Sequence, residues 1–205
     1  LAHDRSLFFF NKGRVALYAI LKSLDIGPGD EVIVPGFTCV VVPSAICYLG
    51  ARPVYADIDL ESYNLSVETL SPLLTPRTRV ILAQNTFGLS ADLDPIMALA
   101  EKQGIQVIED CAHGLGAAYK GRPAGTNTHA AFFSTQWSKP ISTGIGGIAC
   151  VRDRELARKV GELAAALLRP SFSEQLLLWA QLLIRPLADA PALHYRLIAL
   201  YRFLT

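Results

Sequence analysis

The stretch Gln106-Val-Ile-Glu-Asp-Cys-Ala-His-Gly-Leu-Gly116 joins a short apolar run to a carboxylate and a histidine that follow it closely. The run predicts a buried strand over Gln106–Asp110. Similar apolar runs recur along the chain, and segments with helical periodicity separate them. Such alternation is typical of a sheet wrapped by helices, so the predicted fold class is α/β.

The remaining elements follow from the same patterns. Strands are expected at Glu31–Pro35, Pro53–Asp57, Arg79–Gln84, Ala130–Ser134 and Gly147–Val151, and helices at Val15–Leu24, Val40–Leu49, Val67–Leu74, Leu93–Gln103 and Arg154–Leu168. The turn sequence Gly27-Pro-Gly-Asp30 ends the first helix and leads into a strand. Ser66 with Thr69 is a weaker start signal for a helix, because the usual Glu is missing.

Composition excludes several classes of protein. The chain has 205 residues, of which 51% are hydrophobic and 18% are charged. A chain this apolar can fold into a core, which argues against disorder. The 19 Lys and Arg against 18 Asp and Glu leave a net charge of +1, so there is no basic excess to neutralise nucleic acid. One large domain is expected at this length.

The four cysteines, Cys39, Cys47, Cys111 and Cys150, contain no C-x-x-C pair. Their spacing fits neither a zinc site nor a dense disulfide framework, so no metal centre is predicted. The apolar run Leu7–Phe10 lacks the architecture of a signal peptide. A reducing, cytoplasmic compartment is the expectation.

The chain changes character near Pro170, so the predicted domains are 1–168 and an apolar helical tail over 169–205. The run Leu176–Ile184 is too short to span a bilayer. One interpretation is a helix buried against the large domain or a partner subunit. The other is a helix on a membrane surface, with Arg185, Arg196 and Arg202 toward anionic lipid.

Lys139 lies just past a predicted strand, in an apolar loop that is rich in glycine. A desolvated amine has a lowered pKa and becomes a nucleophile that can bond to a carbonyl carbon. Pro140 favours an extended backbone at Lys139. The alternative for an isolated lysine is a solvated surface charge.

Asp110 ends an apolar strand, where open α/β sheets place their ligand crevice. A buried carboxylate needs a cation, and a protonated pyridine nitrogen is one. His113 lies three residues further on and can reach the same ring. The alternative is an Asp that caps the next turn beside a structural histidine.

Gly13 and Arg14 open the first predicted helix. Free N–H groups and the helix dipole allow such a helix start to bind a phosphate, and Ser134 can add a hydroxyl. The alternative is a helix start that binds no ligand. An anion seat, a carboxylate and a nucleophilic amine together suit pyridoxal 5′-phosphate, which carries a phosphate, a ring nitrogen and an aldehyde.

The chain resembles the DegT/DnrJ/EryC1/StrS aminotransferases over Gly13 to Val151. The matching phrases, in the family's order, are Gly27–Pro35, Leu49–Val54, Asp57-Ile-Asp59, Thr75–Thr78, Gly88–Asp94, Val107–Asp110, and Phe133-Ser134 with Lys139. The resemblance implies a fold-type-I large domain, with a mostly parallel seven-stranded sheet and helices on both faces. It also implies a smaller C-terminal domain, which is absent or truncated here.

By this resemblance, Lys139 matches the lysine that bonds to the cofactor, and Asp110 matches the partner of its ring nitrogen. His113 matches the residue beside the ring and its phenolic oxygen, and Ser134 a phosphate-binding hydroxyl. Gly13 and Arg14 match the phosphate-binding pair, although the family usually has Thr where Arg14 stands.

Two further positions depart from the family's pattern. Cys39, which follows Thr38 at the cofactor site, replaces a residue that is often aromatic and stacks on the ring. Gln136 replaces a common His before the lysine.

The implied reaction is transfer of an amino group from an amino acid, glutamate in most of the family, to a nucleotide-linked keto sugar. The product would enter cell-surface polysaccharides or secondary metabolites. A homodimer with shared active sites is implied, and neither nucleic acid nor a transmembrane segment is expected. The alternatives are the family's dehydratase branch, which carries His at the lysine position, and an inactive or regulatory homologue. A Rossmann dehydrogenase is disfavoured, because Thr143–Gly147 lacks the strand, G-x-G-x-x-G and helix order.

Overall fold

The computed structural model describes residues 4–167, 171–188 and 195–196, and the chain divides into two units between Ala166 and Leu167. The strands are β1 Ser6–Phe10, β2 Glu31–Pro35, β3 Arg52–Ala56, β4 Thr78–Gln84, β5 Gln106–Asp110, β6 Ala118–Tyr119, β7 Arg122–Pro123, β8 Ala130–Ser134 and β9 Gly147–Val151. The α-helices are α1 Gly13–Ser23, α2 Val41–Cys47, α3 Val67–Leu70, α4 Leu93–Gln103, α5 Arg154–Ala166 and α6 Phe172–Ala188, and 3₁₀ turns occupy Ser71–Leu73 and Thr86–Gly88.

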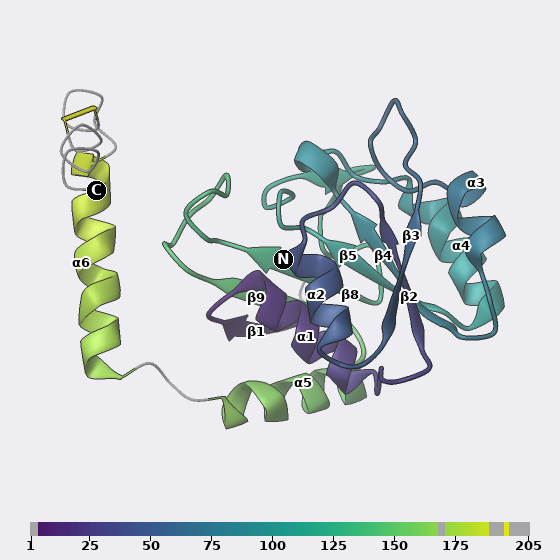
Figure 1. The fold of residues 1–205 in the computed structure, drawn as a ribbon, viewed down its shortest axis with the longest axis horizontal. Helices are drawn as coiled ribbons and strands as arrows, with labels where there is room; N and C mark the ends of the chain where they lie inside the picture. Colours follow the sequence, from purple (N-terminus) through teal and green to yellow (C-terminus); the bar gives the residue numbers. More distant parts are fainter. Residues whose placement is uncertain (1–3, 168–170, 189–194, 197–205) are drawn as a thin grey trace. The chain divides into compact units, whose positions relative to one another are not determined.

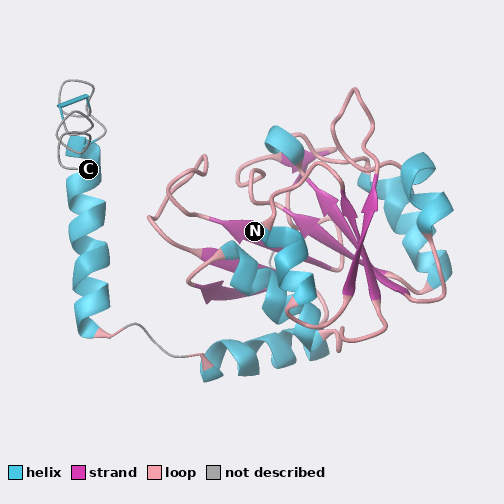
Figure 2. Cartoon of the chain, viewed as in Figure 1, coloured by secondary structure: helices cyan, strands magenta, loops and turns pink. Residues whose placement is uncertain are grey.

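One seven-stranded sheet organises the first unit (Figure 2). Its strands follow the order β1-β9-β8-β5-β4-β2-β3. The central strands β3, β2, β4, β5 and β8 pair in parallel. Strand β9 runs antiparallel to both of its neighbours, β8 and β1. The prediction of a mostly parallel seven-stranded sheet is therefore confirmed.

Helices cover both faces of this sheet, as predicted (Figure 1). Alternate residues of a strand point to opposite faces. Val32 and Val34 of β2 pack in one apolar cluster with residues of α1, α2 and α5. Ile33, between them, packs in a second cluster with residues of α3 and α4. The strands are apolar on both faces because both faces are covered, which explains their continuous apolar runs.

The predicted elements agree closely with the observed ones, and β1 is the main omission. Ser6–Phe10 forms an edge strand whose partner lies far along the chain, with Ser6 opposite Val151. The prediction for the first helix is also displaced, because α1 begins at Gly13 rather than Val15. That helix ends at Leu24, where Asp25 adopts a left-handed backbone (φ 58°), before the Gly27 turn.

The Ser66 start signal is stronger than its sequence indicates. The Ser66 Oγ accepts the Thr69 N–H at 3.4 Å, and the Thr69 Oγ1 accepts the Ser66 N–H at 3.2 Å. Thr69 therefore completes the capping box in place of Glu. The helix turns 3₁₀ at Ser71, where Pro72 follows, so the predicted helix Val67–Leu74 is divided.

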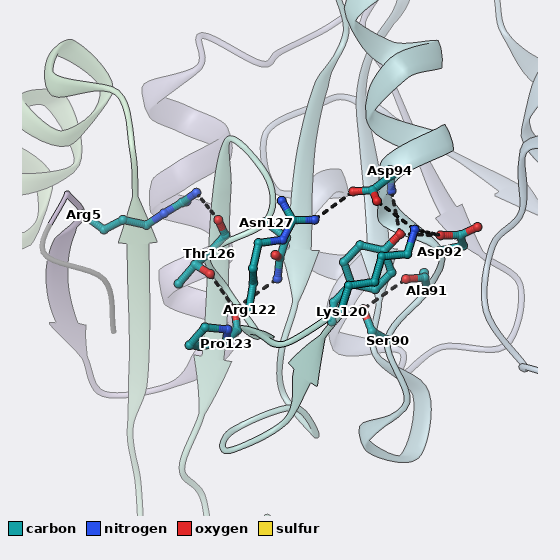
Figure 3. A network of polar contacts seen from close by, with 11 residues as sticks. Arg5, Ser90, Ala91, Asp92, Asp94, Lys120, Arg122, Pro123, Thr126 and Asn127 are labelled. Carbon is teal, nitrogen blue, oxygen red and sulfur yellow. Dashed lines mark hydrogen bonds and ion pairs between the residues drawn. The ribbon is translucent and has the colours of Figure 1, made fainter.

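A polar network ties the β6–β7 hairpin to the start of α4 (Figure 3). The buried Tyr119 hydroxyl donates to Asp92 and accepts the Asp94 N–H at 3.1 Å. Lys120 and Arg122 each approach a carboxylate oxygen of Asp94 at 2.8 Å. Because these ion pairs are solvated they add little stability, and the buried tyrosine carries most of the connection.

The second unit contains α6, whose start is capped by Ser171 and Glu174. Ser171 N–H donates to the Glu174 carboxylate at 2.7 Å, and the Ser171 Oγ accepts the Glu174 N–H at 3.3 Å. Within the described part of the chain, no helix is both long and apolar enough to cross a membrane. Residues 169–170, 189–194 and 197–205 of the predicted tail, with Arg202, lie outside the described residues.

Candidate cofactor site

A pocket in the first unit lies at the carboxyl ends of the parallel strands, where α/β sheets bind ligands. Strands β4, β5 and β8 contribute their last residues, Gln84, Asp110 and Ser134. The pocket encloses about 230 Å³. All eight site residues predicted from the sequence line it: Gly13, Arg14, Thr38, Cys39, Asp110, His113, Ser134 and Lys139.

Asp110 is a buried carboxylate at the floor of the pocket. It is 4% exposed, and its Oδ1 accepts the Ala112 N–H at 2.9 Å. Burial raises the pKa of Asp110 to about 6, although the Ala112 N–H and then the charge of Lys139 act in the opposite direction. The carboxylate is therefore ready to pair with a bound cation, which would replace some of the lost hydration.

Lys139 lies in the loop between β8 and β9, which is closed at its neck by two threonines. Thr135 N–H donates to the Gly146 carbonyl at 3.0 Å, and Thr143 N–H donates to the Thr135 carbonyl at 2.9 Å. The two threonine hydroxyls also pair at 2.7 Å. These contacts hold both ends of the loop together, and the half-buried Lys139 side chain faces the same pocket as Asp110.

His113 lies at the rim of the pocket, with its ring parallel to that of Phe87. The interplanar angle is 5° and the ring centroids are 6.4 Å apart. Partial burial and then the charge of Lys139 lower the pKa of His113. The imidazole is therefore neutral at pH 7, when it can both donate and accept a hydrogen bond.

The start of α1 lies against the end of β8 and the start of β9, because three small residues, Gly13, Ser134 and Gly147, meet there. A Cβ on Gly13 would lie 2.9 Å from the Ser134 Cβ, and one on Gly147 would lie 2.3 Å from the Lys12 carbonyl oxygen. The cap residue Lys12 makes no side-chain capping bond. Free N–H groups in the first turn, Arg14 and Ser134 thus surround one part of the pocket and suit an anion.

Sequence reasoning missed part of the lining, mainly Lys12, Phe37, Gln84, Asn85, Thr86 and Phe87. Gln84 orients Thr38, since the Thr38 hydroxyl donates to the Gln84 Oε1 at 2.6 Å. The signal for these residues was present: Gln84 ends a predicted strand, and residues just beyond strand ends lie at the ligand crevice. Gln136, a departure from the family's pattern, also lines the pocket.

A carboxylate, an amine and a helix start suited to an anion thus share one pocket of an α/β domain, as in cofactor-binding domains. Comparison identifies which one: residues 4–175 match the DegT/DnrJ/EryC1/StrS aminotransferase family, and the chain belongs to that family.

Among curated relatives, the UDP-N-acetyl-3-dehydro-alpha-D-glucosamine 3-aminotransferase of Acidithiobacillus ferrooxidans is 43% identical over 149 residues, which cover 72% of this chain and 40% of that protein. The UDP-2-acetamido-2-deoxy-3-oxo-D-glucuronate aminotransferase of Pseudomonas aeruginosa is 44% identical over 153 residues, covering 74% and 43%. This chain therefore spans less than half the length of these relatives.

Solved structures agree. The aminotransferase from Psychrobacter cryohalolentis superposes with a TM-score of 0.75 at 32% identity, covering 88% of this chain and 52% of that one. DesV from S. venezuelae, solved with a ketimine intermediate, gives a TM-score of 0.76 at 35% identity, covering 82% and 46%. The predicted fold-type-I large domain is confirmed by these likenesses.

Proposed function

We propose that this chain is the cofactor-binding part of a pyridoxal-phosphate-dependent aminotransferase. It would move an amino group from an amino acid, most simply glutamate, to a nucleotide-linked keto sugar for polysaccharide or secondary-metabolite synthesis. The observation that carries the proposal is the shared pocket of Asp110, Lys139 and the α1 start. Family membership and relatives named for UDP-sugars support it.

The residues present fit this cofactor at each of its polar groups. The first turn of α1 offers N–H groups for a phosphate, with Gly13 leaving room and Ser134 adding a hydroxyl. Arg14 supplies a guanidinium where the family has a threonine, and a guanidinium can bind a phosphate through two donors. Asp110 supplies the anion that a ring nitrogen requires, and Lys139 the amine that an aldehyde requires.

When bound, pyridoxal phosphate supplies an aldehyde and an electron-withdrawing ring. Asp110 would keep the ring nitrogen protonated by pairing with it, which is favourable because burial disfavours the charge of an unpaired Asp110 carboxylate. Lys139, once its amine is free, takes the proton from the α-carbon of the donor and later returns it, first as a base and then as an acid. His113, whose lowered pKa keeps it neutral at pH 7, would flank the ring.

The proposal extends to the rest of the protein. Residues 1–168 form the cofactor-binding portion, residues 169–205 form a packing or interface segment, and two copies share their active sites. A reducing, cytoplasmic setting is part of it, since all four cysteines lie in the described residues as free thiols. The dehydratase alternative is disfavoured because Lys139 stands where that branch has His.

The test is the first half of the reaction. Protein loaded with pyridoxal phosphate is mixed with glutamate, and 2-oxoglutarate is measured together with the cofactor absorbance. Wild type should release one 2-oxoglutarate per cofactor, whereas Lys139→Ala should slow this at least about a hundredfold. The exposed Lys22→Ala is the matched control and should behave as wild type. No 2-oxoglutarate from loaded wild type would refute the proposal and favour the inactive homologue.

A further inference from the structure

Three aromatic side chains gather at the mouth of the pocket: Phe37, Tyr63 and Phe87, here called the aromatic triad. Their ring centroids lie 6.0 to 6.2 Å apart. The rings nevertheless remain 47%, 45% and 69% exposed, respectively. Phe37 and Phe87 line the same pocket as Lys139, and Tyr63 contacts both of them.

The backbone under the triad is strained. Tyr63 has a φ of 57° and Phe87 a φ of 54°, in the left-handed region that bulky residues avoid. Such a conformation costs about 1–2 kcal/mol relative to the usual backbone. An exposed ring gains little from packing, so the strain is not offset by the ring's own burial. Strained residues of this kind concentrate at binding sites.

A buried hydrogen-bond network holds the three loops that carry the triad. Gln84 Nε2 donates to the Phe37 carbonyl at 3.1 Å and to the Thr86 hydroxyl at 2.8 Å. The Thr86 hydroxyl donates in turn to the Tyr63 carbonyl at 3.0 Å. One amide and one hydroxyl thus fix the backbones of two triad residues at once.

Asn64 fixes the third loop. Its Oδ1 accepts the Thr86 N–H at 3.0 Å, and its Nδ2 donates to the Leu89 carbonyl at 3.0 Å. These contacts bracket Phe87, and Asn64 is fully buried. Gln84, Thr86 and Asn64 are therefore positioning residues that preorganise exposed rings, which is how a rigid binding surface is built.

The shape of the triad selects the ligand. The rings are inclined to one another by 50°, 59° and 70°, so no two of them can sandwich a flat group. A nucleobase binds best by stacking flat on an aromatic face. A saturated sugar ring can instead turn C–H groups toward several inclined rings, because the face of an aromatic ring carries negative charge. The triad also lies at the mouth of the pocket that contains Lys139.

We propose that the aromatic triad binds the sugar ring of the acceptor and holds it toward Lys139. This inference rests on the proposed function for the identity of the acceptor. To the proposed function, the inference adds a binding subsite for the sugar ring and the residues that preorganise this subsite.

The experiment is calorimetric binding to the Lys139→Ala variant, with UDP-N-acetylglucosamine, UDP and N-acetylglucosamine as the probes. Phe87→Ala and Phe37→Ala should each raise the Kd for UDP-N-acetylglucosamine roughly 5- to 50-fold, and change the Kd for UDP less than about twofold. Tyr48→Ala removes an aromatic that is 80% exposed and outside the pocket, and should leave both Kd values unchanged.

Phe87→Gly separates a binding role from a structural one. Glycine accepts the left-handed backbone, so this variant should lose sugar binding like Phe87→Ala but melt about 2–8 °C higher than wild type. A lower melting temperature with unchanged Kd would make the ring structural and overturn the proposal.

Four other results would also overturn the proposal. One is that the Lys139→Ala chain binds no UDP-N-acetylglucosamine, and another is that its Kd for this probe does not change when a triad ring is removed. The other two are that ring removal weakens UDP binding equally, or that it changes the sedimentation coefficient and leaves the Kd unchanged. Equal weakening would place the nucleobase on the triad, and a sedimentation shift would make the triad a contact between copies. Calorimetry needs no cofactor chemistry. If the triad binds the sugar but the loaded wild type releases no 2-oxoglutarate from glutamate, only the proposed function is contradicted. A normal half-reaction with triad-independent binding would contradict only the subsite.

Discussion

Gly147→Ala tests the close approach that creates the anion seat. A Cβ at Gly147 would lie 2.3 Å from both the carbonyl carbon and oxygen of Lys12, and 2.5 Å from the Gly13 nitrogen. Ordinary contacts are at about 3.5 Å, so the helix start must retreat by about 1 Å. The obstructing atoms are all backbone, so no side chain can rotate away to relieve the overlap.

Overpacking of this kind costs about 1–3 kcal/mol, and the upper end applies because α1 must move away from both β8 and β9. At about 2–4 °C per kcal/mol for a chain of this size, Gly147→Ala should melt about 6–12 °C lower than wild type. Thermal unfolding followed by circular dichroism measures this. It should also weaken cofactor binding, measured by absorbance titration, because the N–H groups of the first turn move.

Gly27→Ala is the matched control. Gly27 lies outside the left-handed region, and a Cβ there meets its nearest atom at 3.9 Å. The melting temperature of the Gly27→Ala variant should stay within about 2 °C of wild type. If Gly147→Ala melts as wild type does, the proposed packing of α1 against the strand ends is wrong.

Two further predictions concern the floor and the neck of the site. Since burial raises the pKa of Asp110 from 3.8 to about 6, its stabilising contribution is complete below pH 3.8 and is lost as the pH rises through 6. In cofactor-free protein, Asp110→Asn should therefore gain up to about 3 kcal/mol over wild type in urea unfolding at pH 8 and little at pH 4; an equal difference at both pH values would contradict the buried carboxylate. A Cβ on Gly146 would lie 2.1 Å from the Thr135 Oγ1, so Gly146→Ala should cost about 2 kcal/mol and Thr135→Ala should recover part of that loss. Strictly additive unfolding energies in the double variant would show that the two residues do not meet.

The elements of the central sheet were predictable because burial on both faces leaves a continuous apolar run. Strands β2, β5, β8 and β9 have the predicted bounds. Strand β1 was not predictable, because its edge pairing with β9 depends on residues about 140 positions away. No local sequence pattern indicates such a distant partner. Two helix boundaries also moved: α1 begins at Gly13 rather than Val15, and α3 ends at Leu70 because the chain turns 3₁₀ at Ser71 before Pro72.

The candidate site divides in the same way. Residues with distinctive chemistry after a strand, such as Asp110 and Lys139, were predicted to share a pocket, and they do. Gln84 and Thr86 stand at the end of a predicted strand and could have been included, whereas Asn64 could not, because a buried amide acts only through neighbours that the fold supplies. Phe37 and Phe87 read as ordinary apolar residues in the sequence, and only their exposure at the pocket mouth sets them apart.

The most direct measurement is to identify the amine that bonds to the cofactor. Protein incubated with pyridoxal phosphate is reduced with borohydride, digested, and mapped by mass spectrometry. The account predicts one modified lysine, Lys139, whose modification disappears in Lys139→Ala without moving to Lys12, which lines the same pocket. Modification spread over exposed lysines, or none at Lys139, would contradict it.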